Sequence, residues 1–241
     1  MKLACIPATL SAALGVSTSN AIAQVDLEFR AFTPIVDPGD VIEVGLYAIA
    51  PSSPVQTVGA FEAIVTWDTN FVSLIGFDPS NPASLIFGGF PMAGSDGINE
   101  APVPADGDAL FIGLSPLGSP ITATPAGTLL GTLLFDAVSG TPGTPISLVA
   151  SLAAPPRDTV VFDGITPNTD VTGMVSGDSV IISCGPVDQA PPFGVLDLDD
   201  VDVFIDAFMT QDILADIAPP TGIFDLDDVD AFIALFLMGC P

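Results

Sequence analysis

The sequence predicts a mainly β protein, an antiparallel β-sandwich followed by a small helical tail. Glycine (23 residues) and proline (24 residues) punctuate a chain of 241 residues. Such punctuation, with short apolar runs between, favours many short strands over long helices. Hydrophobic residues make up 49% of the chain and charged residues 13%, which excludes a disordered acidic polymer. The end of the chain departs from the strand pattern, because it contains two copies of one loop–helix sequence.

Residues 1–23 have the pattern of a secretory signal peptide. Lys2 supplies the positive start, an apolar stretch follows over residues 3–16, and Ala21-Ile22-Ala23 fits the small-residue rule for cleavage. A buried N-terminal helix or a membrane anchor is the alternative. The apolar stretch is too short to span a bilayer, and no later segment has the required length. We therefore expect a secreted protein without a membrane span.

Removal of this peptide sharpens the charge and cysteine counts. Arg30 and Arg157 then remain against all 29 carboxylates. Such a surface repels phosphate backbones and anionic membranes, so we expect no nucleic-acid partner. Two cysteines also remain, Cys184 and Cys240. An even pair in an exported chain predicts one disulfide.

Residues 24–183 are predicted to form the sandwich. The segment 57–67 alternates, with Phe61 and Trp67 on the same face. Roughly nine or ten short strands without a helix-length pattern favour an antiparallel sandwich. The clearest expected strands are 25–32, 41–49, 57–67, 129–138, 146–152, 160–162, 171–175 and 179–182. The segment 87–108 is rich in Gly, Pro and Asp and is expected to be a surface loop.

Residues 184–241 form the second predicted domain. Residues 188–208 and 216–236 match at a constant offset of 28, which is a strong repeat signal. Each copy is a loop followed by a helical pattern that places Leu198, Val201, Ile205 and Phe208 of the first copy on one face. We expect the two helices to bury these stripes against each other. A disulfide closing the pair would stabilise it by about 3–4 kcal/mol in the chain-entropy model.

The loop aspartates have two explanations. In each loop two aspartates stand three residues apart after a glycine, at Asp197 and Asp200 and again at Asp225 and Asp228. Calcium takes six to eight oxygen ligands from such loops. Alternatively, the first aspartate of each pair is the N-cap of a helix and the second occupies its first turn, where acids favour the helix dipole. The residues alone leave both explanations open.

The duplicated sequence resembles type I dockerins, and most closely the divergent ones that end in Gly-Cys, here Gly239-Cys240. The resemblance implies that calcium is bound by six aspartates, Asp188, Asp197, Asp200, Asp216, Asp225 and Asp228. It also implies that four residues help to choose the partner, Leu198, Asp199, Leu226 and Asp227. The sequence departs from the family pattern, because the first aspartate of each loop lies one residue too early. Ala, Pro, Phe or Thr also replace two further ligands of each loop, so we expect weak or degenerate calcium sites.

The strand-rich region resembles cohesins. Residues 38–44 are similar to the opening strand of a cohesin, residues 59–68 to its central strand, and residues 71–75, 127–135 and 146–148 to later segments. This resemblance implies a nine-stranded jelly roll, related to carbohydrate-binding modules, that binds dockerins through one sheet face. Together the two resemblances predict a non-catalytic interaction protein whose partners are cohesin- or dockerin-type modules. A link to extracellular polysaccharide binding or breakdown is compatible with this prediction.

The sequence leaves three other hypotheses to consider. A carbohydrate-binding module usually needs exposed aromatic residues, and we expect Trp67 and Tyr47, the single Trp and Tyr, to pack within strands. A structural or adhesive role at the cell envelope is compatible with docking. An enzyme would lack histidine altogether and would depend on a carboxylate pair. The acids that crowd one loop are Asp96, Glu100, Asp106 and Asp108, and nothing distinguishes them from solvated acids, so we predict no enzyme.

Overall fold

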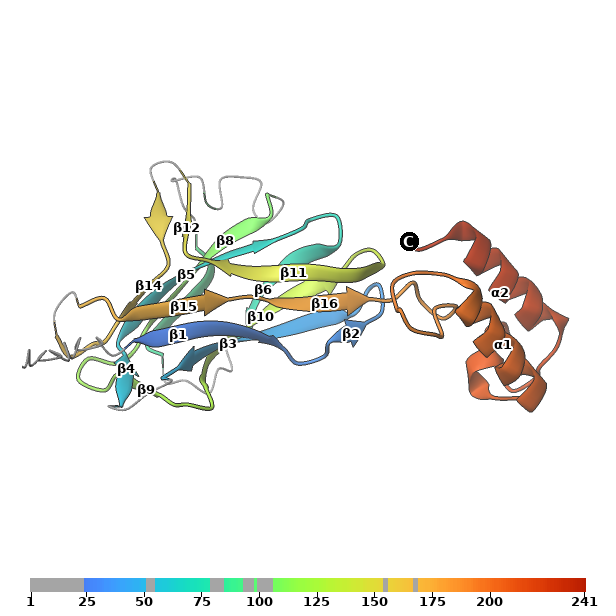
Figure 1. Ribbon diagram of the computed structural model, residues 1–241, viewed down its shortest axis with the longest axis horizontal. Coiled ribbons are helices and arrows are strands. Elements are labelled where there is room, and N and C mark those ends of the chain that lie inside the picture. Colours follow the sequence, from blue (N-terminus) through green and yellow to red (C-terminus); the bar gives the residue numbers. More distant parts are fainter. Residues whose placement is uncertain are drawn as a thin grey trace, which may run out of the picture.

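A computed structural model shows a strand-rich body with a helical tail at one end (Figure 1). The structure describes residues 24–50, 55–78, 85–92, 98, 106–153, 156–166 and 169–241. The predicted signal peptide lies outside the described residues, as do Asp96, Glu100 and part of the predicted loop 87–108. The predicted fold class, a mainly β sandwich with a helical tail, is confirmed.

The first sheet has five strands in the order β15-β1-β3-β10-β6. Its strands are β1 (Val25–Ala31), β3 (Val41–Ile49), β6 (Val72–Asp78), β10 (Thr128–Ala137) and β15 (Thr172–Ser176). All neighbours in this sheet are antiparallel except β1 and β15, which run parallel. The late strand β15 therefore closes the sheet beside the first strand, which joins the two ends of the sandwich sequence.

The second sheet has seven strands, six of them in the order β2-β16-β11-β5-β8-β7, with β14 also paired to β5. Its strands are β2 (Ile35–Val36), β5 (Ala60–Trp67), β7 (Phe87–Met92), β8 (Asp108–Leu114), β11 (Thr141–Val149), β14 (Val160–Phe162) and β16 (Asp178–Ile182). Two small pairs lie apart, β4 (Gln56–Val58) with β9 (Ile121–Ala123) and β12 (Ser151–Leu152) with β13 (Arg157–Asp158). The chain crosses repeatedly between the two sheets, as in a jelly roll.

The core lies between the two sheets. The expected alternation on β5 is confirmed, since Phe61 and Trp67 are both buried. Phe61 meets Phe111 edge-on at 5.0 Å, and Trp67 meets Phe135 at 5.5 Å, so that aromatic rings from both sheets interlock. Trp67 is 7% exposed and its ring is used in the core, as predicted. Tyr47 is half-buried, and the Arg30 guanidinium lies 4.5 Å from the centre of its ring.

Two expected segments differ from the structure. The expected strand 57–67 is divided at Gly59, because a Cβ there would lie 2.3 Å from the Cα of Gly164. This close approach requires glycine and interrupts the pairing. The expected loop 87–108 begins with the strand β7, which pairs with β8. The Gly and Pro residues of this segment favoured a loop in the sequence. The strand β7 nevertheless forms there, because it lies at an edge of the sheet, where such residues are tolerated.

The tail consists of α1 (Leu198–Thr210), the short 3-10 helix η1 (Ile213–Ala215) and α2 (Leu226–Met238). Asp197 and Asp225 are the N-caps of the two α-helices, and each helix has a complete capping box. Helix α1 ends at Gln211, which adopts a left-handed conformation. None of the helices within the described ranges is long and apolar enough to cross a membrane.

Candidate protein-docking surface

The second aspartate of each pair binds backbone amides. Asp200 Oδ1 accepts hydrogen bonds from the amides of Gln189 (2.7 Å) and Ala190 (2.8 Å), and its Oδ2 accepts one from the amide of Asp197 (2.9 Å). Its side chain is fully buried. Because the donors stand at both ends of the loop, this one carboxylate closes it. Asp197 in turn accepts a hydrogen bond from the amide of Asp199 (2.8 Å), as an N-cap does.

The second loop repeats these contacts. Asp228 Oδ1 accepts hydrogen bonds from the amides of Ile217 and Ala218, both at 2.9 Å, and its Oδ2 accepts one from Asp225 (3.0 Å). The side chain of Asp228 is also fully buried. The amides of Ala218, Asp225 and Ile217 stabilise the ionised form and lower the pKa of Asp228, although its burial opposes them.

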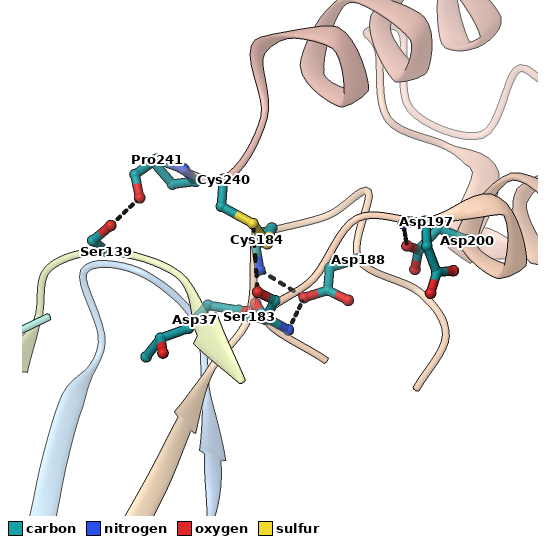
Figure 2. Close-up of a disulfide and its surroundings, with 12 residues drawn as sticks. Asp37, Ser139, Ser183, Cys184, Asp188, Asp197, Asp200, Cys240 and Pro241 are labelled. Atoms are coloured by element: carbon teal, nitrogen blue, oxygen red, sulfur yellow. Dashed lines mark hydrogen bonds between the residues drawn. A yellow bond between two sulfur atoms is a disulfide. The ribbon is translucent and has the colours of Figure 1, made fainter. Parts of the chain in front are cut away.

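The first aspartates of the two loops differ in their surroundings. Asp188 Oδ2 accepts hydrogen bonds from the amides of Gly194 (2.6 Å) and Cys184 (2.7 Å), close to the disulfide (Figure 2). Burial disfavours its charge and raises the pKa of Asp188 despite these two bonds. Asp216 Oδ2 accepts one such bond, from the amide of Gly222 (2.6 Å). The Oδ1 atoms of Asp188 and Asp216 are buried without a hydrogen-bond partner.

These contacts do not fit a calcium loop. The residues that the structure describes bring no three Asp, Glu, His or Cys side chains together as a metal site. The carboxylates of Asp200 and Asp228 are occupied by amides instead. The helix-capping explanation therefore accounts for the positions of Asp197, Asp200, Asp225 and Asp228.

The predicted disulfide is present. It joins Cys184, before the first loop, to Cys240, after α2, with the two Cα atoms 4.5 Å apart. Figure 2 shows the bond beside the contact of Pro241 with Ser139 of the sandwich. The oxygen of Pro241 also accepts a hydrogen bond from the amide of Gly140 (3.2 Å). Both ends of the tail are thus held at one place.

The two helices pack through their phenylalanines. The rings of Phe204 and Phe232 stack with centroids 4.1 Å apart and planes 16° from parallel. Phe208 and Phe236 extend this stack on either side. The prediction that the stripe of Leu198, Val201 and Ile205 would be buried between the helices is wrong for Leu198 and Ile205, which are exposed. Phe204, one residue before Ile205, occupies the interface and turns the stripe toward the surface.

The exposed stripes form an apolar groove, which we name the docking face. Its volume is about 240 Å³, and all its lining residues are apolar: Val201, Phe204, Ile205, Val229, Phe232, Ile233, Phe236 and Leu237. Ile205 is 50% exposed and its counterpart Ile233 is 48% exposed. Three lining residues of α1 have their counterparts 28 residues later in α2, whereas Phe236 and Leu237 come from α2 alone. Helical periodicity was the signal for these residues, but it did not show which side of the stripe faces solvent.

The four predicted partner-choosing residues lie at the helix starts. Leu198 and Leu226 are exposed by 76% and 75%. Leu198 shares a helical face with Val201 and Ile205, because residues three, four and seven apart align on a helix. Asp199 and Asp227 are also exposed. These residues therefore lie beside the docking face, and their role in choosing a partner stays a prediction.

The tail is uniformly acidic. Every charged residue of 184–241 is an aspartate. The two arginines of residues 24–241 lie in the sandwich, where Arg30 pairs with Glu28 (3.0 Å) and Arg157 with Glu62 (2.9 Å). An apolar groove in a tail whose charged residues are all aspartates is suited to a partner that offers apolar side chains flanked by cations.

No family model and no curated protein sequence matches this chain. Solved structures that it resembles are cohesin modules. One is the cohesin module of a family 33 glycoside hydrolase from Clostridium perfringens, with 13% identity, a TM-score of 0.46, and coverage of 66% of this chain and 97% of that one. The solution structure of CaCohA2 from Clostridium acetobutylicum has 16% identity, a TM-score of 0.45, and coverage of 70% and 94%. A type II cohesin domain from the cellulosome of Acetivibrio cellulolyticus has 8% identity, a TM-score of 0.43, and coverage of 65% and 95%.

Proposed function

We propose that this chain is a secreted, non-catalytic interaction protein that docks to a partner protein through the docking face of its tail. The observation that carries the proposal is the exposed apolar groove between α1 and α2. Exposed apolar side chains that are gathered in one groove, rather than scattered singly, are typical of an interaction site. Here the patch is built from matching residues of two helices and is flanked by the exposed Leu198 and Leu226.

The partner is a different protein rather than a second copy. Binding would bring the aspartate-rich helices α1 and α2 close to the opposing surface. Another copy presents mainly carboxylates, since 29 acids accompany three basic residues in the full sequence and both sandwich arginines are paired. Like charges brought together at an interface cost binding free energy. The partner therefore carries Lys or Arg around an apolar strip, and a cohesin-type module is the class that the sequence resemblance favours.

Export is supported by two features. Residues 1–23 have the pattern of a signal peptide, and a disulfide persists in an oxidising compartment. Any link to polysaccharide would come through the partner, because the buried Trp67 offers no sugar platform. The described acids of the predicted loop, Asp106 and Asp108, flank a turn at the start of β8. We expect no release of reducing sugar from polysaccharides by the purified protein.

The docking face can be tested by substitution. Secreted proteins of the organism that encodes the chain are passed over immobilised residues 24–241, and a retained protein is identified, purified and titrated by calorimetry. We expect the double variant Ile205→Asp/Ile233→Asp to weaken binding at least about tenfold, because it buries two charges in an apolar contact.

A matched control carries the same chemical change elsewhere. Met174→Asp places a carboxylate on β15 of the sandwich, at a residue that is 74% exposed, and should leave the affinity unchanged. Circular dichroism must show that both variants keep their helices. Equal affinities of the double variant and the wild type would refute docking through this face.

A further inference from the structure

We infer that the tail folds without calcium, because Asp200 and Asp228 close the two loops by binding backbone amides directly. The inference concerns the folding of the tail and goes beyond the proposed function. Its consequence for docking, that chelators do not release the partner, rests on that function.

The carboxylate oxygens are already committed. An ionised carboxylate offers about four lone-pair sites on two oxygens. Asp200 Oδ1 accepts two amides, at 2.7 and 2.8 Å, and Oδ2 accepts a third at 2.9 Å. A calcium ion would need an oxygen at about 2.3–2.6 Å, and it would repel the N–H dipoles that point at the same atom. The amides and the metal therefore compete, and the amides are present within the chain.

The rest of each loop supplies too few ligands. One carboxylate oxygen per loop, Oδ1 of Asp188 or Asp216, is buried without a hydrogen-bond partner. Calcium takes six to eight oxygens, so nearly all of its ligands here would have to be backbone carbonyls or waters, whereas a single ordered water can satisfy this one atom. The positions between Asp188 and Gly194 hold Gln189, Ala190, two prolines and Phe193, so most of the intervening side chains offer no oxygen.

The same arrangement occurs twice. The three amide bonds of Asp228 reproduce those of Asp200 at positions shifted by 28 residues, with distances within about 0.2 Å. Both aspartates are fully buried. A buried carboxylate is stable when amides surround it, because hydrogen bonds to the charged form offset its desolvation. Each loop is therefore closed by a buried carboxylate of its own, Asp200 or Asp228, rather than by an added metal ion.

The chain allows the tail and the sandwich to be followed separately. The single Trp and the single Tyr of the sequence are Trp67 and Tyr47, both in the sandwich, whereas the α-helices of the described residues lie in the tail. Far-UV circular dichroism of the helices thus reports the tail, and Trp67 fluorescence reports the sandwich.

Thermal unfolding of residues 24–241 is compared in excess EDTA, in millimolar calcium chloride, and in magnesium chloride at equal ionic strength. We expect the same helical signal and the same helical midpoint in all three. A midpoint that rises with calcium by more than about 5 °C over magnesium, or a calorimetric isotherm for calcium, would overturn the inference. Magnesium controls for simple screening of the acidic chain.

Substitution at the two classes of aspartate gives an independent measurement. Asp228→Asn puts an amide group opposite backbone amides, so it should lower the helical midpoint by about 5 °C or more, equally in calcium and in EDTA. Asp227→Asn is the matched control, because Asp227 is exposed, and it should change the midpoint little. An effect of Asp228→Asn confined to calcium would overturn the inference. A calcium-dependent tail could still dock, so these outcomes do not depend on the docking test.

Discussion

The two loop–helix repeats of the tail have nearly the same sequence and the same internal hydrogen bonds, yet the loop glycine of the first lies against the sandwich and that of the second does not. A Cβ at Gly194 would lie 2.3 Å from the carbonyl carbon and oxygen of Thr141, whereas a Cβ at Gly222 would meet nothing within 4 Å. Both glycines have positive φ, +82° and +87°. The repeat sequence therefore determines the conformation of each loop, whereas contact with the sandwich determines how much each loop contributes to the stability of the tail.

The same contrast holds at the first aspartate of each loop. Asp188 is buried and accepts a hydrogen bond from the amide of Cys184, next to the end of the sandwich. Within the described residues, Asp216 accepts a hydrogen bond from the amide of Gly222 but none that corresponds to the bond from Cys184. Figure 1 shows the first loop adjoining the end of β16, and the C-terminal end of α2 returning toward the same end of the sandwich. The first repeat adjoins the sandwich through its loop, whereas the second is held there through its C-terminal residues, by the disulfide and by the contacts of Pro241.

The largest effect is expected from the disulfide. The bond closes 56 residues of sequence separation, and its loss in Cys184→Ser/Cys240→Ser should lower the free energy of unfolding of the helical signal by about 4 kcal/mol. Urea titration followed by circular dichroism measures this change, with Trp67 fluorescence as the report on the sandwich. A reductant should destabilise the wild type and leave the double variant unchanged. An unaltered helical transition would mean that the second repeat is held by other contacts.

A smaller, paired effect is expected at the two glycines. Gly222→Ala should cost about 1–2 kcal/mol, from the left-handed conformation alone. Gly194→Ala should cost about 3–4 kcal/mol, because the backbone of Thr141 must also move. Equilibrium unfolding of both variants in urea measures the difference. Equal costs would show that the contact between the first loop and the sandwich is absent in solution.

The smallest effect is expected in the pH dependence, where the repeats have opposite signs. The folded pKa of Asp228 is lowered, so its stabilisation is complete above the ordinary pKa, about 3.9, and is lost as the pH falls through the folded pKa. The folded pKa of Asp188 is raised, so its contribution is complete below about 3.9 and is lost as the pH rises through the raised pKa.

Urea midpoints of the helical signal between acid and neutral pH test this contrast. Asp228→Asn should flatten the acid side of the curve, and Asp188→Asn should flatten the part above the ordinary Asp pKa. If both variants flattened the same part of the plot of urea midpoint against pH, the pKa values of Asp188 and Asp228 would not be shifted in opposite directions.

Much of the molecule could be predicted from local pattern. The strand β3 begins and ends at the residues expected, Val41 and Ile49, because alternation and turn residues on both sides define it. The N-cap positions of Asp197 and Asp225 were one of the two explanations that the local pattern offered for these aspartates, and both residues cap their helices. The disulfide followed from an even pair of cysteines.

What could not be predicted depends on residues far apart in the sequence. The interruption at Gly59 arises from Gly164, and the need for glycine at 194 arises from Thr141. The choice of Phe204 rather than Ile205 for the helix interface depends on how α1 meets α2. The two residues lie about 100° apart on the helix, and periodicity does not decide which side of the stripe turns inward. That choice left Ile205 and Ile233 exposed and created the docking face.

The sequence by itself therefore determined the fold class, the duplicated loop–helix tail and the cysteine pair that closes it, since each depends on spacing within a short segment. Tertiary structure alone decided which of the two loops lies against the sandwich and which helix face stays open. It also decided that the loop carboxylates point at backbone amides. These features depend on the distances between segments that are far apart in the sequence. Those distances are fixed by the packing of the sandwich core and of the Phe204–Phe232 stack, and they cannot be read from local sequence patterns.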